Sequence, residues 1–327
     1  MKAYVLSEFG PAENLRLTEV ETPVPGDGEV LVRVRATSVN PYDWHHMRGE
    51  PVVARYLDKG LGRRPNRSVL GCDLAGEIAA VGPGVTGWRP GDEVYALVRN
   101  GSYAEYARVP AANLAPRPRS LSFEQAAALP MAAVTALVAL RDAKIAAGHR
   151  ILVNGASGGV GTFAVQLACA MGAEVVGVCS GRNADLVRSL GATHVIDYTA
   201  QDFTRAARGF DALLDVAGSP SVWSARRVLR PGGTYVVVGG VAGRWVRPID
   251  HLVAAQLMGR LARRPVAATA FGIGAASARD LRELTELCDS GKVSPVIARR
   301  YPFAELPEAV DFVERGHAPG KVVVAVG

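Results

Sequence analysis

Hydrophobic and polar residues alternate in short runs along the first third of the chain, with glycine and proline between the runs. In residues 29–39, EVLVRVRATSV, valines alternate with Arg33 and Arg35, a period of two that is typical of a half-buried β-strand. The stretches LAGEIAAVG and GDEVYAL have the same texture, and the turn-rich GPGVTGWRPGD lies between them. The pattern predicts a compact β-rich domain over residues 1–121.

After residue 121, strand-like and helix-like stretches begin to alternate. Ser122 stands directly before FEQAAA and is a candidate helix N-cap. Strand-like stretches follow at RILVNG, EVVGVCS, THVIDY, FDALLDVAG and TYVVVGG, and RPVAATAF is a candidate sixth. This alternation predicts βαβ units, and hence an α/β fold with a doubly wound parallel sheet over residues 122–272. An amphipathic helix and a strand at residues 277–297 predict that residues 273–327 return to the first domain.

The most informative motif is NGASGGVG, residues 154–161, which follows a predicted strand and opens a predicted helix. A helix start offers free N–H groups and a positive dipole end, so it can hold a pyrophosphate without a basic side chain. Against the pattern G-x-G-x-x-G, Ala156 stands at the first glycine position. In this context the motif predicts a dinucleotide site. Its expected contacts are Ala156, Ser157, Gly158, Gly159, Val160 and Gly161.

The end of the next strand, VCSGRNAD, indicates which dinucleotide is bound. Sheets that bind NAD place Asp or Glu here to hold the ribose 2′-OH, but no acid occurs from Cys179 to Arg182. Ser180 and Arg182 can donate to a 2′-phosphate, so the sequence favours NADPH over NADH. The alternative for Arg182 is a solvated residue at a helix start, and Asp185 is interpreted as a surface residue.

Composition is that of a soluble globular enzyme, with 49% hydrophobic and 21% charged residues. The net charge is +6, but the densest basic runs, GRRPNR and GRLARRP, contain no aromatics, so no nucleic-acid partner is expected. Residues 151–173 carry no charge, yet their glycines, Asn154 and Ser157 favour a buried strand, turn and helix over a membrane span. The apolar run at the N-terminus is too short for a signal peptide. We therefore expect a cytoplasmic protein.

The motifs above, together with NPYDWHHMRG, LGCDLAGEIAAVGPGVTGWRPGDEVYAL, GSYAEYARVP, LGATHVIDY, LRPGGTYVVVGG and GHAPGKVVVAVG, give the chain a family likeness. It resembles the medium-chain dehydrogenase/reductase superfamily in its zinc-free quinone oxidoreductase (zeta-crystallin-like) branch, nearly end to end. The resemblance implies a GroES-like β-rich catalytic domain, an inserted Rossmann domain, and a cofactor in the cleft between them. It also implies a homodimer formed through the Rossmann domains.

The resemblance bears on whether the chain holds a metal. Zinc alcohol dehydrogenases of the superfamily hold zinc with an early Cys, the His of a GHE motif and a later Cys or acid. Here Asn40 and Cys72 stand at the first two positions, and an amide with one thiolate does not make a three-ligand site. The four cysteines of the chain form no C-x-x-C pair, so a structural zinc is not expected either. His45 and His46, neighbours in a segment taken as extended, should point in opposite directions, and we expect surface or packing roles for them.

Without a Lewis acid, the site suits an acceptor that takes a hydride readily, such as a quinone or an α,β-unsaturated carbonyl. We expect NADPH to deliver that hydride and a donor to serve the developing oxygen. Asn40 is expected to hydrogen-bond the nicotinamide ribose or the substrate oxygen. Tyr42 is the candidate proton donor, with water as the alternative. Asp43 either takes part in the chemistry or holds the turn at Trp44.

Further cofactor contacts follow from the resemblance. Thr135 matches a position beside the nicotinamide, or is an ordinary helical threonine. Tyr198 matches a position beside the adenosine phosphate or pyrophosphate. Lys321 looks like a cofactor-side contact, or is a surface lysine ahead of an edge strand. The strand ends VAG and VGGVA reach the carboxyl edge of the sheet, where open α/β folds bind ligands. Their candidate contacts are Val216, Ala217, Gly239, Gly240 and Val241.

Two rival functions remain open. An NADP-dependent secondary alcohol dehydrogenase predicts bound metal and alcohol-dependent reduction of NADP. A non-catalytic NADPH-binding sensor predicts cofactor binding without turnover. The sequence does not specify the acceptor. The role of residues 243–265, the segment that varies most in shape among such enzymes, is not specified either, and Trp245 within it either walls an apolar acceptor or packs in a dimer interface.

Overall fold

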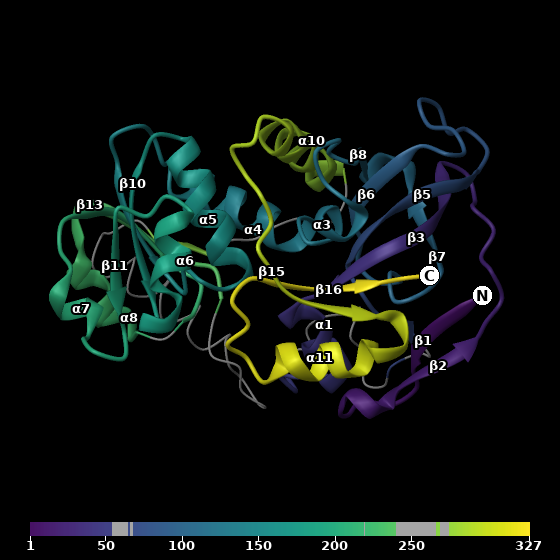
Figure 1. The fold of residues 1–327 in the computed structure, drawn as a ribbon, viewed down its shortest axis with the longest axis horizontal. Coiled ribbons are helices and arrows are strands. Elements are labelled where there is room, and N and C mark those ends of the chain that lie inside the picture. Colours follow the sequence, from purple (N-terminus) through teal and green to yellow (C-terminus); the bar gives the residue numbers. More distant parts are fainter. Residues whose placement is uncertain (54–64, 66–67, 219, 240–265, 269–274) are drawn as a thin grey trace. The chain divides into compact units, whose positions relative to one another are not determined.

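The structure is a computed structural model that describes residues 1–53, 65, 68–218, 220–239, 266–268 and 275–327 (Figure 1). The chain divides into two compact units. The first unit comprises Met1–Val134 and Gly272–Gly327, and the second comprises Thr135–Phe271. The predicted domain boundaries fall after residues 121 and 272, and the two units of the structure divide after residues 134 and 271.

The first unit is built on a seven-stranded sheet in which all pairs are antiparallel except β15 with β16. In β3 the valines are buried and Arg33 is exposed, so the period of two predicted the strand correctly. A smaller antiparallel sheet has the order β2 (Leu15–Glu19), β1 (Lys2–Leu6), β4 (Ser68–Val69). The strands of the large sheet are β15 (Ile297–Pro302), β16 (Lys321–Ala325), β3 (Glu29–Val39), β5 (Asp73–Val81), β6 (Glu93–Leu97) and β8 (Leu114–Pro116), with β7 (Tyr106–Pro110) paired to β3.

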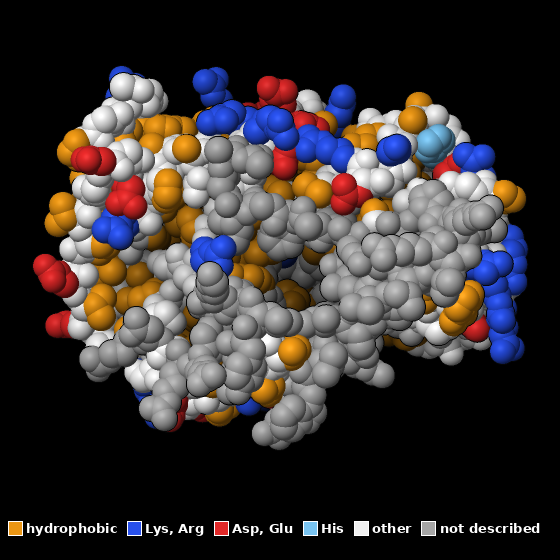
Figure 2. All heavy atoms as spheres, turned by 180° about the vertical axis from the view of Figure 1, so that it is seen from behind, with side chains coloured by type: hydrophobic (Ala, Val, Ile, Leu, Met, Phe, Trp, Pro, Cys, Tyr) orange, Lys and Arg blue, Asp and Glu red, His pale blue; other side chains and the backbone are white. Residues whose placement is uncertain are grey.

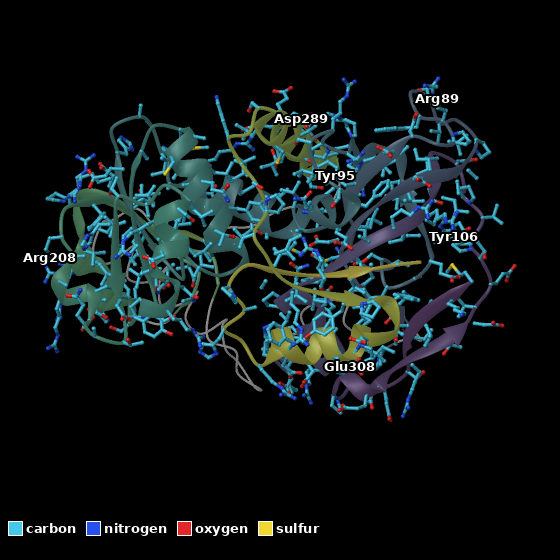
Figure 3. All side chains as sticks on the ribbon, in the orientation of Figure 1. Arg89, Tyr95, Tyr106, Arg208, Asp289 and Glu308 are labelled. Carbon is cyan, nitrogen blue, oxygen red and sulfur yellow. The ribbon has the colours of Figure 1, made fainter. Side chains whose placement is uncertain are left out.

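Helices cover this sheet, and the C-terminal helix α10 packs on it. Tyr95 of β6 donates from its hydroxyl to the Leu281 carbonyl of α10 (2.5 Å), and lies beneath that helix in Figure 3. Ser122 caps α3 as predicted, since its Oγ accepts the Gln125 N–H (3.3 Å). Helix α3 belongs to the first unit because it packs on β3 and β5. The helices are α1 (Pro41–Arg48), α3 (Phe123–Ala127), α10 (Ala275–Asp289) and α11 (Leu306–Glu314), with 3₁₀ turns η1 (Ala12–Asn14), η2 (Ala111–Asn113) and η5 (Phe303–Glu305).

The second unit is a six-stranded parallel sheet with the order β11-β10-β9-β12-β13-β14, which confirms the predicted α/β class and the candidate sixth strand. Its strands are β11 (His194–Asp197), β10 (Glu174–Cys179), β9 (Arg150–Asn154), β12 (Phe210–Asp215), β13 (Leu229–Val237) and β14 (Val266–Ala268). Its helices are α5 (Gly159–Ala170), α6 (Ala184–Ser189), α7 (Phe203–Ala206) and α8 (Val222–Ala225), with η3 (Gly181–Asn183) and η4 (Arg226–Val228), and α4 (Pro130–Asp142) runs across the boundary.

The uncharged stretch at 151–173 forms β9, a turn and α5, as its glycines predicted. Phe163 and Leu167 of α5 are buried, so the helix is apolar because it is enclosed by protein. Among the helices that the structure describes, none has the length and apolarity to cross a bilayer. On the described part of the face drawn in Figure 2, most Lys and Arg side chains lie along the top and at the right edge, and Asp and Glu side chains lie among those at the top and at the left.

Candidate functional site

In the second unit, the glycine-rich turn after β9 is packed as tightly as a phosphate-binding turn requires. Gly155 has a left-handed backbone (φ +87°), and Gly158 is the N-cap of α5. A Cβ on Gly161 would overlap the backbone oxygen of Gly155 and lie 2.8 Å from Cα of Ala156. Only glycine at this position lets α5 begin so close to the turn. This close approach of a helix start to a glycine turn is the packing that a pyrophosphate-binding turn requires.

The residue that makes the tight turn is not the one at the predicted first glycine position. Ala156 stood at the first glycine of the fingerprint, but the residue that makes the tight turn is Gly155. Ala156 is buried, and Gly177 of β10 leaves room for it, because a Cβ on Gly177 would lie 3.1 Å from that of Ala156. Gly155 was absent from the predicted contacts. The Asn-Gly pair directly after a strand is the turn signal that was available.

The segment after β10 is tied to this turn. Asn183 donates from Nδ2 to Oγ of Ser157 (3.1 Å) and to Oγ of Ser180 (3.3 Å). Asn183, which was not among the predicted contacts, thereby joins the glycine turn to the segment after β10. Arg182 is exposed beside them on η3.

An acid from the neighbouring strand also reaches this segment. Asp197 of β11 pairs with Cys179, and a Cβ on Gly181 would overlap Oδ2 of Asp197. Its Oδ1 accepts the Thr199 hydroxyl (2.7 Å) and N–H (2.9 Å), and these bonds hold the pKa of Asp197 below its ordinary value. A negative charge therefore lies beside Gly181, although no acid occurs in the local sequence. Tyr198, the next residue, has 51% of its side chain exposed.

The predicted strand ends at the carboxyl edge of the sheet lie together. Val216 and Ala217 follow β12, and Gly239 lies just beyond β13. A Cβ on Gly239 would overlap the carbonyl oxygen of Val216, so the two segments are in contact. Gly240, Val241 and Trp245 lie outside the described residues. Thr135 is buried in α4.

In the first unit, Asn40 and Asp43 begin α1. Asn40 is the N-cap, its N–H donates to Oδ2 of Asp43 (2.8 Å), and both side chains are buried. Asp43 therefore has the turn-holding role that was its alternative to chemistry. Contact of either residue with a substrate or cofactor stays a prediction.

The expectation that the histidine segment is extended is wrong, because Pro41–Arg48 is the helix α1. The two imidazoles nevertheless have different partners. His45 stacks on Trp44 (3.7 Å between centroids), and His46 packs on the ring of Tyr42 (3.9 Å). Burial lowers the pKa of His45. In the described ranges, no group of three or more His, Cys, Asp or Glu side chains is placed to hold a metal ion. Zinc independence stays a prediction.

Lys321 is buried, so the alternative of a surface lysine is wrong. It lies in β16, which is flanked by β15 and β3 and is therefore no edge strand. Its Nζ donates to Oδ1 of Asn40 and to Oδ2 of Asp73 (3.2 Å). Asn40 in turn donates from Nδ2 to the same Asp73 oxygen (2.8 Å). Both ends of the Asn40 amide are thus engaged within the first unit.

Asp73 is the centre of this polar cluster and is fully buried. Its Oδ2 also accepts the Ser38 hydroxyl (2.5 Å), and its Oδ1 accepts the Met131 N–H at the start of α4 (2.8 Å). Cys72 lies beside it, with Sγ 3.4 Å from Nδ2 of Asn40. Burial, and then the charge of Asp43, raise the pKa of the Cys72 thiol. Cys72, which stands where zinc alcohol dehydrogenases of the superfamily have a zinc ligand, is therefore a buried, neutral thiol.

The cluster predicts that stability depends on pH through Asp43. Burial first, and then the charge of Asp73, raise the pKa of Asp43 to about 7. An unfolded Asp has a pKa of about 3.9, so the folded chain holds this proton more tightly. Stability is therefore lost as pH rises from about 4 to about 7. Each pH unit across this range costs about 1.36 kcal/mol of unfolding free energy, so the full loss approaches about 4 kcal/mol.

Asp43→Asn tests this dependence, because asparagine keeps an oxygen for the Asn40 N–H and cannot ionise. The free energy of unfolding in urea should favour the variant increasingly between about pH 4 and about pH 7. Asp27→Asn, on an exposed turn, is the control and should differ from wild type by a constant amount. A constant difference for Asp43→Asn as well would contradict the assignment.

A GroES-like β unit and a parallel sheet with a dinucleotide turn define an oxidoreductase fold, and comparisons with known proteins agree. The Alcohol dehydrogenase GroES-like domain family matches residues 26–119, and the Zinc-binding dehydrogenase family matches residues 190–324. The chain is 36% identical to the NAD(P)H oxidoreductase RTN4IP1, mitochondrial, of Mus musculus, over 100% of this chain and 89% of that protein.

Two further relatives have informative names. The NADPH-dependent alkenal/one oxidoreductase, chloroplastic, of Arabidopsis thaliana is 32% identical over 99% of this chain and 79% of its own length. The solved structure of the quinone oxidoreductase from Coxiella burnetii is 30% identical, covers 100% of this chain and 99% of that one, and superposes with a TM-score of 0.88. The chain belongs to the medium-chain dehydrogenase/reductase superfamily, in its quinone oxidoreductase branch.

Proposed function

We propose that this protein is a zinc-independent reductase that uses NADPH to reduce a quinone or an α,β-unsaturated carbonyl compound. The observation that carries the proposal is the glycine turn packed on the start of α5, with Ser180 tied to it through Asn183. The names of the Arabidopsis and Coxiella relatives support both acceptor classes. We further propose that the protein is a homodimer. We also propose a cytoplasmic location, while the mouse and Arabidopsis relatives are named as mitochondrial and chloroplastic.

When bound, the reduced nicotinamide supplies the hydride. The first turn of α5 holds the pyrophosphate with backbone N–H groups, and Arg182 and Ser180 donate to the 2′-phosphate. Asp197 keeps Gly181 in place beside them. Tyr42, half-buried on α1, donates a proton to the developing enolate or quinol oxygen. Because the amide of Asn40 is already bonded at both ends, its part is to hold the start of α1, and with it Tyr42.

One experiment separates this proposal from its rivals. The purified protein, analysed for metal, is mixed with NADPH and a panel of quinones, enones and ketones, and loss of the nicotinamide absorbance is followed. Reduction of quinones or enones by metal-free protein supports the proposal. Bound zinc with alcohol-dependent reduction of NADP would instead identify a secondary alcohol dehydrogenase. NADPH binding without turnover on any acceptor would identify a sensor or partner protein.

Arg182→Gln is expected to weaken NADPH selectively. Loss of one charge-assisted hydrogen bond should raise KM for NADPH by roughly tenfold or more, and leave KM for NADH within about twofold. Steady-state kinetics with each cofactor measure the ratio. Arg188→Gln is the matched control, because Arg188 is exposed on α6 and pairs with Asp185 (2.7 Å). Equal changes for NADPH and NADH would rule out a 2′-phosphate contact.

Tyr42→Phe is expected to lower kcat by roughly 100-fold if the phenol is the proton donor, while KM for NADPH changes little. Tyr106→Phe on β7 is the control and should keep wild-type kcat, because Tyr106 lies outside the polar cluster around Asp73. A wild-type kcat for Tyr42→Phe would assign the proton to water.

A further inference from the structure

The carboxyl edge of the second unit's sheet contains a buried acid that was not among the predicted site residues. Asp215 ends β12 and its side chain is 0% exposed. Its Oδ1 accepts Nδ2 of Asn154 (2.7 Å) and the N–H of Gly218 (2.8 Å). Its Oδ2 accepts the hydroxyl of Tyr235 (2.7 Å). A carboxylate buried this deeply is tolerated only when hydrogen-bond donors reach its oxygens, and both oxygens of Asp215 have such donors.

These partners border three separate segments of the candidate cofactor site. Asn154 is the last residue of β9, directly before the glycine turn. Gly218 closes the segment that contains Val216 and Ala217. Tyr235 lies in β13, the strand that leads to Gly239.

The backbone of Asp215 adds to the same junction. Its carbonyl oxygen accepts the N–H groups of Val238 (3.0 Å) and Gly239 (3.2 Å). The Val216 N–H donates to the Asn154 carbonyl (3.0 Å), which draws the first two segments together again. Segments beyond the strand ends have no β-ladder hydrogen bonds, so their positions depend on individual hydrogen bonds of this kind.

We propose that Asp215 is a positioning residue for the nicotinamide cofactor, whose carboxylate fixes the glycine turn and the 216–218 segment in the arrangement that receives it. This inference rests on the proposed function. The two Oδ1 bonds, to Asn154 and Gly218, set the cofactor-facing segments. The Oδ2 bond, to Tyr235, anchors the acid to the sheet and contributes to stability.

The test compares NADPH dissociation constants by calorimetric titration, together with unfolding temperatures, in four variants. Asp215→Leu removes every acceptor and should raise Kd by roughly tenfold or more. Asp215→Asn should restore Kd to within about threefold of wild type, since an amide can accept from Asn154 and Gly218 and donate to Tyr235. Tyr235→Phe should lower the unfolding temperature but change Kd by less than about threefold, whereas Asn154→Ala should raise Kd by roughly fivefold.

The pairing of Asn154→Ala with Tyr235→Phe keeps the test decisive if Asp215→Leu fails to fold. A rise in Kd confined to Asn154→Ala supports positioning, and equal rises in both variants overturn it. A folded Asp215→Leu with wild-type Kd overturns it as well. Wild-type protein that binds NADPH but reduces no acceptor refutes the proposed function alone, because the binding comparison does not require turnover. Wild-type protein that binds no nicotinamide cofactor overturns both.

Discussion

The Gly161→Ala variant is expected to bind NADPH roughly 100-fold more weakly than the wild-type chain, a change of about 2.7 kcal/mol. A Cβ at position 161 would overlap the backbone oxygen of Gly155 and approach Cα of Ala156 to 2.8 Å. Both are backbone atoms that cannot rotate away, so α5 must move from the turn. The N–H groups that we propose to hold the pyrophosphate would then lose their common direction. Calorimetric titration with NADPH measures the effect.

Gly158→Ala is the informative comparison. A Cβ there would have its nearest neighbour, the Gly155 oxygen, at an ordinary 3.5 Å, and the backbone at Gly158 is extended. Its unfolding temperature should stay within about 4 °C of wild type, while Gly161→Ala should lose more. Wild-type affinity in Gly161→Ala would show that the close packing of α5 on the turn is not needed for binding.

Lys321→Met is expected to destabilise the chain by about 3–5 kcal/mol, because it leaves the buried carboxylate of Asp73 without its cation. Lys321 and Asp73 are 3% and 0% exposed, so water cannot replace the lost ammonium. Oδ1 of Asn40 would lose its donor at the same time. Denaturant unfolding at neutral pH measures the free energy.

Arg48→Met serves as the matched control for this loss. Arg48 pairs with Glu314 at 2.7 Å, but the two side chains are 32% and 21% exposed. A pair with this access to water should contribute about 1 kcal/mol or less. Similar losses of unfolding free energy in both variants would show that stability depends no more on the charge of the buried Lys321 than on that of the partly exposed Arg48.

Local pattern explains why much of the fold was predictable. The alternation in β3, the Ser122 cap and the strand–turn–helix at 150–170 each depend on residues within a few positions of one another. The helix α1 was missed, although its signal was also local. Pro41 follows the N-cap Asn40, and Asp43 stands three residues after that cap, which is a helix start.

The remaining features of the site join residues that are distant in sequence, so no local pattern predicts them. Lys321 reaches Asn40 across 281 positions, and Asp215 reaches Asn154 across 61. Asp197 lies beside Gly181 only because β11 pairs with β10 in that register.

By itself, the sequence determined the β-rich and βα halves and the glycine-rich turn, since periodicity and glycine spacing are properties of neighbouring residues, and its motifs carried the resemblance to the family. Only the tertiary structure decided that Lys321 is buried, that Asp197 lies beside Gly181, and that Asp215 joins the strand ends. Those outcomes depend on strand order and register, which set the distance between side chains that the chain itself keeps far apart.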